Sequence, residues 1–142
     1  MSLVRDIIAR LKEPQTLFKA VCGAAEFSVI EKRRSAAPAA YVMVADEASG
    51  ENERATGRIL QRLETDIAVV IVTDNLSDAR MGQAAEDIEA LKAFVRSRLI
   101  GFEPSDAAEP VTHISGDLIK AHGGAVWFED RYSVPTYLEE QP

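Results

Sequence analysis

The sequence predicts an α+β fold: a mixed, largely antiparallel sheet with one long amphipathic helix packed on one face and a short N-terminal helix. Three patterns carry this prediction. Apolar and polar residues alternate from Ile59 onward, which is typical of a strand, and apolar residues recur at helical spacing from Met81 to Leu99. The third pattern is His122-Gly-Gly124, a hairpin turn signal between two apolar stretches. With 142 residues, we expect one domain over residues 1–142.

The first 38 residues predict short elements. Ser2 can cap a first helix, and Pro14 ends it. Leu17–Val21 is an apolar stretch whose type the pattern leaves open, and Ala24–Arg33 predicts a short helix with Phe27 and Ile30 inward. Ser35-Ala-Ala-Pro38 interrupts the chain. The apolar residues of the first helix share one face: Leu3, Ile7, Ile8 and Leu11.

The middle of the chain predicts two strands separated by a polar segment. Tyr41–Ala45 is apolar on both faces, so it belongs inside the sheet. Asp46–Gly57 has no large apolar residue and is interpreted as a solvated loop or an extended hairpin tip. The strand that starts at Ile59 begins half exposed and becomes apolar on both faces from Ala68 to Val72.

The long helix is the most sharply defined element of the sequence. Asp74–Asp78 has turn and cap chemistry, with Ser77 as the expected N-cap. Gly101 is a natural C-terminal cap, and Pro104 prevents continuation. The apolar face of this helix consists of Met81, Ala85, Ile88, Leu91, Val95 and Leu99.

The C-terminal third predicts further strands. Val111–Ile114 is interpreted as a short strand, and Leu118–Ala121 with Ala125–Tyr132 as the two arms of the hairpin. Trp127 and Phe128 are neighbours on a strand, so they should not both be exposed. We expect the tail, Leu138–Pro142, to be frayed.

The charge distribution argues against general binding along nucleic acid. The net charge is −7, and residues 1–34 hold seven basic and four acidic residues, so the remainder carries −10. A surface of that sign repels phosphate, and Lys32-Arg33-Arg34 is too short to form a strong basic patch. No apolar run approaches the roughly 20 residues of a membrane-spanning helix, so no membrane partner is expected.

The sequence contains no recognisable catalytic or cofactor motif. It lacks phosphate-binding glycine loops, HExxH, CxxC and the GxSxG elbow. His113 and His122 have no metal-ligand spacing to other ligands, and Cys22 is interpreted as a small buried hydrophobe. Glu129 and Asp130 are adjacent on a strand and point to opposite faces, so they cannot act as an acid/base pair. We therefore expect no enzyme activity, cofactor or metal.

The order and spacing of several segments resemble the tail terminator proteins of long-tailed bacteriophages and prophages, including Mu-like and lambda-like phages. The resemblance covers about 100 residues. Phe102 stands where an aromatic residue, often Trp, is expected before the Pro turn, which is a mild departure. The segments that carry it are Pro38–Ala45, Asn52, Gly57–Gln61, Asp66–Asn75, Leu99–Pro104, Gly116–Leu118 and Val126–Phe128.

This resemblance implies a small structural protein that forms a hexameric ring. The ring caps the finished tail tube, stops its polymerisation and presents a surface to the head. The implied partners are other copies of the chain, the tail tube protein and a head-completion or connector protein, with DNA only passing through. The implied location is the host cytoplasm during assembly and then the virion tail.

A ring requires two different lateral surfaces, and charged residues on separate regions can supply them. We interpret the polar segment and the strand after it as the candidate ring or tube interface. In the ring, Arg54, Arg58 and Arg62 would face Glu64, Asp66 or the acidic C-terminal third. The candidate residues are Asp46, Glu47, Glu51, Asn52, Glu53, Arg54, Arg58, Arg62, Glu64 and Asp66.

Two other classes of function remain open from the sequence. One is another phage neck or tail-completion component, and the other is a small enzyme whose site has no recognisable motif. Neighbouring reading frames for tail tube and head-completion proteins would favour the phage classes. A mass measurement in solution would then distinguish a ring from a monomer.

Overall fold

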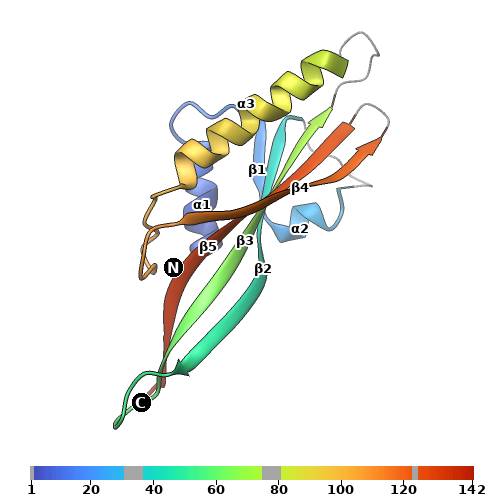
Figure 1. Ribbon diagram of the computed structural model, residues 1–142. Coiled ribbons are helices and arrows are strands. Elements are labelled where there is room, and N and C mark those ends of the chain that lie inside the picture. The colour runs from blue at the N-terminus through green and yellow to red at the C-terminus, as the bar shows by residue number, and fades with distance from the viewer. Residues whose placement is uncertain (1, 31–36, 75–80, 123–124) are drawn as a thin grey trace.

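The computed structural model describes residues 2–30, 37–74, 81–122 and 125–142 (Figure 1). Its five-stranded sheet has the order β1-β2-β3-β5-β4, with β1 parallel to β2 and every other pair antiparallel. The predicted α+β class with a mixed, largely antiparallel sheet is therefore confirmed. The elements are α1 (Leu3–Lys12), β1 (Ala20–Cys22), α2 (Ala24–Phe27), β2 (Ala39–Asn52), β3 (Leu60–Asp74), α3 (Met81–Leu99), β4 (Thr112–His122) and β5 (Ala125–Glu139).

Helices cover both faces of the upper sheet, and the sheet separates two hydrophobic cores (Figure 1). On one face α1 and α3 enclose the larger core, in which Ile71, Ile88, Leu91 and Val95 pack together as the sequence predicted. On the opposite face α2 covers a smaller core, where the Phe27 ring lies 5.5 Å from Tyr41 and 5.9 Å from Trp127. Trp127 and Phe128 therefore belong to different cores, and the alternation of β5 separates them.

The described start of α1 and the described end of α3 agree with the sequence predictions. Ser2 accepts a hydrogen bond from the backbone nitrogen of Arg5 at 3.4 Å, so it caps α1. Gly101, just past α3, has φ +87°, a left-handed conformation that glycine adopts without a steric penalty. The expected N-cap of α3, Ser77, lies outside the described residues.

The lower half of the molecule is a three-stranded ribbon. β2, β3 and β5 run on past the helices as a twisted arm that ends at the β2–β3 turn and the C-terminus (Figure 1). We call residues 46–66 and 133–139 the ribbon. Along β2 the residues change from buried at Ala39–Val42 to exposed from Val44 onward.

The solvated-loop interpretation of Asp46–Gly57 is wrong, and the extended-hairpin alternative is confirmed. Asp46–Asn52 is strand, paired with β3 from Asp66 to Gln61, and only the turn after Asn52 lacks strand structure. The backbone ladder to β3 supplies the hydrogen bonds of this segment, so its side chains need no apolar partner.

Three further boundaries differ from the sequence expectations. The two predicted strands Val111–Ile114 and Leu118–Ala121 form one strand, β4, which begins at Thr112 and has two register shifts. The tail is not frayed as expected, because Leu138 and Glu139 pair with β3 and the Glu140 nitrogen donates to the Ile59 oxygen at 2.8 Å. The helix predicted over Ala24–Arg33 is shorter: α2 stops at Phe27, although Ile30 is buried as predicted.

Candidate assembly interface

The structure brings all ten candidate interface residues together on the ribbon. The first four lie on the exposed half of β2, the next three in the turn and the last three on β3. This part of the chain, residues 46–66, carries six acidic and three basic residues. In order along the chain they are Asp46, Glu47, Glu51 and Asn52, then Glu53, Arg54 and Arg58, then Arg62, Glu64 and Asp66.

The turn at the end of the ribbon is held by Asn52. Its Oδ1 accepts hydrogen bonds from the backbone nitrogens of Arg54 at 3.2 Å and Leu60 at 3.0 Å. Gly57 has φ +87°, and the Arg54 guanidinium donates to the Arg58 carbonyl oxygen at 3.2 Å. These bonds give the turn one conformation and close it over β3.

The C-terminal residues fasten to the same turn. Arg54 forms an ion pair of 2.5 Å with Glu139, and Glu140 accepts from the backbone nitrogen of Ile59 at 3.1 Å. The turn and the tail thus form a single tip. Because its partner is Glu139 of the same chain, Arg54 already neutralises part of the acidic C-terminal third.

Arg62 also has partners within its own chain. Its guanidinium lies 2.7 Å from Glu64 and 2.5 Å from Glu109, which comes from the segment between α3 and β4. The hydrogen bonds that Arg62 donates to Glu64 and, with a smaller effect, to Glu109 raise the pKa of Arg62. The arrangement joins the ribbon to the loop beside it.

The acids on the exposed half of β2, together with Asp66 on β3, divide into two groups. Asp46 and Asp66 are directly opposite each other on β2 and β3, and with Glu129 they raise the pKa of Arg131, Glu129 contributing most. The side chains of Glu47 and Glu51 are exposed and make no hydrogen bond or ion pair with any residue that the structure describes. Among the described acids of β2, these two remain available to a partner.

A buried charge cluster, which the sequence did not reveal, lies at the centre of the molecule. Asp130 is fully buried on β5 and accepts two hydrogen bonds from Arg96 of α3, both at 2.9 Å. The Tyr132 hydroxyl donates to it at 2.7 Å, and His113 Nε2 of β4 lies 2.9 Å from its Oδ1. One carboxylate therefore ties α3 and β4 to β5.

The partners of Asp130 decide its protonation. Burial raises the pKa of Asp130, but the hydrogen bonds from Arg96, Tyr132 and His113 outweigh burial and leave that pKa below its ordinary value. Burial and the neighbouring Asp130 carboxylate raise the pKa of the Tyr132 hydroxyl. The cluster is a fixed carboxylate with satisfied acceptors, which is an arrangement that stabilises a fold.

Gly116 makes room for this cluster. It pairs with Asp130 across the strands, and a Cβ atom there would lie 2.9 Å from Phe128 Cζ and 3.0 Å from Asp130 Oδ1. One sequence signal pointed to Asp130: it occupies the inward-facing position between Phe128 and Tyr132. The predicted opposite orientation of Glu129 and Asp130 agrees with this placement.

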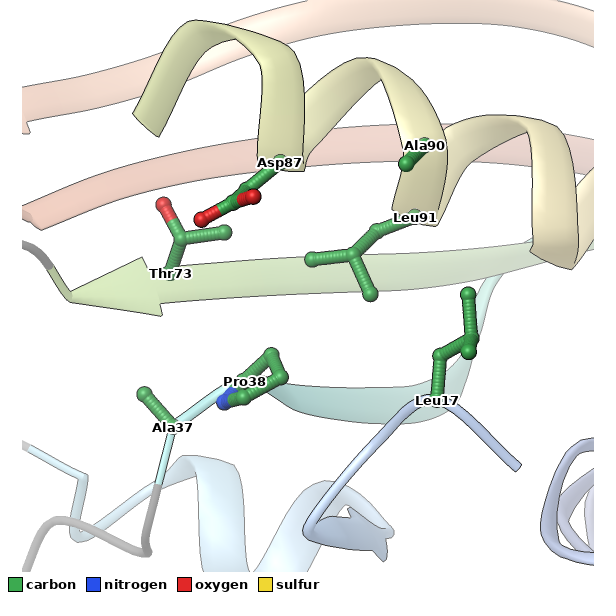
Figure 2. Close-up of a pocket in the computed structure, with 7 residues that line it drawn as sticks. All are labelled: Leu17, Ala37, Pro38, Thr73, Asp87, Ala90 and Leu91. Atoms are coloured by element: carbon green, nitrogen blue, oxygen red, sulfur yellow. The ribbon is translucent and has the colours of Figure 1, made fainter. Parts of the chain in front are cut away.

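A small pocket lies between the start of β2 and α3 (Figure 2). It has a volume of about 280 Å³ and is mostly apolar, with Leu17, Pro38 and Leu91 on its walls. The Thr73 hydroxyl at its base is buried and has no hydrogen-bond partner in the described chain. No group of three His, Cys, Asp or Glu residues able to hold a metal occurs among the described residues.

None of the described helices has the length and apolar character needed to cross a membrane.

Comparisons with known proteins agree with this architecture. A family model described as "Phage tail terminator protein" matches residues 2–141. A solved chain from the virion of a native gene transfer agent particle shares the fold, with a TM-score of 0.60 and 14% sequence identity over 96% of both chains. A search of curated proteins finds no match.

Proposed function

Because this chain belongs to the phage tail terminator protein family, whose members are structural and not enzymatic, we propose that it caps the tail tube of a phage or prophage. In this proposal the chain closes into a ring, with six subunits by resemblance, and ends tube polymerisation. The ring then presents a surface to a head-completion or connector protein. The protein would assemble in the host cytoplasm and remain in the virion tail.

The observation that carries this proposal is the extent of the family match. It runs over residues 2–141 of 142, so the helices, the sheet and the ribbon all lie within it. The solved chain from the gene transfer agent virion supports the fold over the same length.

The ribbon is the segment that we assign to assembly contacts, with the tube or with neighbouring subunits. It projects from the helical body, it holds all ten candidate interface residues, and its outer strand is exposed along its length (Figure 1). A projecting arm can reach a second protein without disturbing the cores. The net charge of −7 would also let DNA pass without adhering to the ring.

Tail length is the measurement that tests this function. The gene is removed from the phage or prophage that encodes it, and tails are examined by electron microscopy with and without the protein supplied in trans. We expect overlong tails that do not join heads, and normal tails on restoration. Tails of normal length that fail to join heads would instead indicate a neck component. Normal, infectious particles without the gene would contradict both phage functions.

A further inference from the structure

Two of the three candidate interface arginines are paired within their own chain. Arg54 pairs with Glu139, and Arg62 pairs with Glu64 and Glu109. These arginines are therefore engaged before any second copy arrives. Arg58 is then the one candidate arginine whose side chain has no described partner, and a single arginine is a weak basic surface. A stronger basic surface for a contact between copies has to come from another part of the chain.

A basic groove lies at the outer edge of β1. It has a volume of about 270 Å³, and its lining includes Lys12, Lys19 and Phe18 together with β1 itself. Both lysines are exposed, and neither side chain makes an ion pair or hydrogen bond with a described residue. No acidic residue lines this groove, which we call the β1 groove.

An acidic strand edge lies on the ribbon. β1 pairs with β2 only at Ala39, Ala40 and Tyr41, so along the described chain the outer edge of β2 has no strand beside it from Val44 to Asn52. This stretch carries three acids and no base, and two of those acids, Glu47 and Glu51, have no described partner. A strand edge of this kind is a template for contact with another chain.

We propose that the acidic β2 edge of one copy lies in the β1 groove of the next copy. The inference rests on the proposed ring and names its lateral contact. The occupant is a second copy because one chain carries both surfaces, and their charges are opposite. A head-to-tail contact between these two different surfaces is heterologous and repeats around a ring until it closes, whereas reciprocal pairing of both surfaces would stop at two copies.

Charge reversal on either side should weaken this contact. We compare Lys12→Glu/Lys19→Glu, the groove variant, with Glu47→Lys/Glu51→Lys, the edge variant. Each variant sets like charges against each other, and we expect roughly tenfold weaker self-association or more, with a smaller difference at high salt. Sedimentation velocity measures the association, and thermal melting establishes that each variant is folded.

The decisive experiment mixes the two variants. The acidic groove of one variant matches the basic edge of the other, and the two unaltered surfaces also match, so alternating rings should form. The same variants are expressed singly and together in the phage that lacks the gene. Singly they should give overlong tails, and together they should restore tail length even if the free protein is monomeric.

Controls that change the charge in the same two directions lie away from both surfaces; the acidic control changes it by half as much as the groove variant. Arg5→Glu on α1 and Glu103→Lys/Asp117→Lys outside the ribbon alter exposed residues, and we expect them to associate like the wild type. Equal loss of association in these controls would mean that net charge alone acts and would overturn the proposed contact.

The outcomes separate this inference from the proposed function. If the wild type limits tail length but the mixed variants do not recover, the contact is wrong and the function stands. If removing the wild type leaves tail length unchanged, the function is wrong. Recovery of an assembly that stops at two subunits would support the contact and contradict the ring. If the groove variant and the edge variant each cap tails normally when expressed alone, the contact between copies does not use the β1 groove and the β2 edge.

Discussion

Arg96 and Asp130 form a two-point ion pair between α3 and β5. Arg96 Nε lies 2.9 Å from Asp130 Oδ2, and Nη2 lies 2.9 Å from Oδ1. The carboxylate is completely buried, whereas 35% of the Arg96 side chain is exposed. The pair therefore attaches α3 to the sheet. Water reaches the Arg96 side of the pair but not the Asp130 carboxylate.

Arg96→Met should destabilise the protein by about 3 kcal/mol, the lower end of the cost of breaking a buried pair, since Arg96 is partly exposed. The buried carboxylate would keep only the bonds from Tyr132 and His113. Urea unfolding measures the change. Lys92→Met is the control. It removes the ion pair with the exposed Glu89, worth about 1 kcal/mol or less, and the contact of the Lys92 ammonium with the Phe128 ring at 4.2 Å, worth about 0.5–1 kcal/mol, so its loss should be smaller than that of Arg96→Met. An equal loss of unfolding free energy in the two variants would contradict a special contribution of the Arg96–Asp130 pair to stability.

Acid should lower the stability of the wild type more steeply than it lowers the stability of Asp130→Asn. The pKa of Asp130 is lower in the folded state than in the unfolded state, so the unfolded chain binds more protons and stability rises with pH. The contribution is complete well above the ordinary aspartate pKa of about 4 and is lost as the pH falls through the lower folded value. Melting temperatures between pH 7 and pH 2 should show the steeper decline in the wild type. Ser105 lowers the pKa of Asp6, so a smaller decline should persist in the variant. Parallel declines would contradict the assignment.

Gly116→Ala should destabilise the fold by roughly 1–3 kcal/mol, the cost of overpacking a fixed site. The added methyl group would lie within 3.0 Å of Phe128 and Asp130, and neither can move away without disturbing the cluster. Gly50→Ala is the matched control on the ribbon, where the nearest atom is 3.6 Å away. Thermal unfolding compares the two. A neutral Gly116→Ala would show that β4 can shift away from β5.

Leu91→Ala should cost roughly 2–5 kcal/mol, because it leaves a cavity between α3 and the sheet. Leu91 is 5% exposed in the larger core, whereas Leu118 on β4 is 61% exposed. Leu118→Ala should therefore change stability by only about 0.5 kcal/mol. Denaturant unfolding of both variants tests the packing of α3, and a loss within error for Leu91→Ala would contradict it.

Replacing the turn residues 53–59 with Asn-Gly should leave the fold intact and impair tail capping. The replaced side chains are exposed and belong to neither core, and the Arg54–Glu139 pair that is lost lies at the surface and is worth about 1 kcal/mol at most. Circular dichroism checks the fold, and electron microscopy of tails checks capping. Normal tails that join heads would exclude the turn from the assembly contacts.

The sequence by itself determined the elements whose buried side chains leave a regular hydropathy pattern. The apolar face of α3 and the passage of β3 from half exposed to buried were both predicted, because burial imposes a repeat that hydropathy records. Gly101 was predicted for the same kind of local reason, since the end of a helix favours a left-handed residue. The family resemblance followed from the order of these segments.

Only the tertiary structure decided the ribbon and the Asp130 cluster. Asp46–Asn52 is held by backbone bonds to β3, which leave no trace in hydropathy, and β1 has three residues, too few to show a repeat. The tail is fixed by Ile59, about 80 residues away along the chain. Asp130 meets Arg96 from another element, and a carboxylate looks the same in a sequence whether water or a guanidinium surrounds it. The path of the ribbon and the protonation of Asp130 both depend on contacts between segments that are distant in the sequence, and only folding brings these segments together.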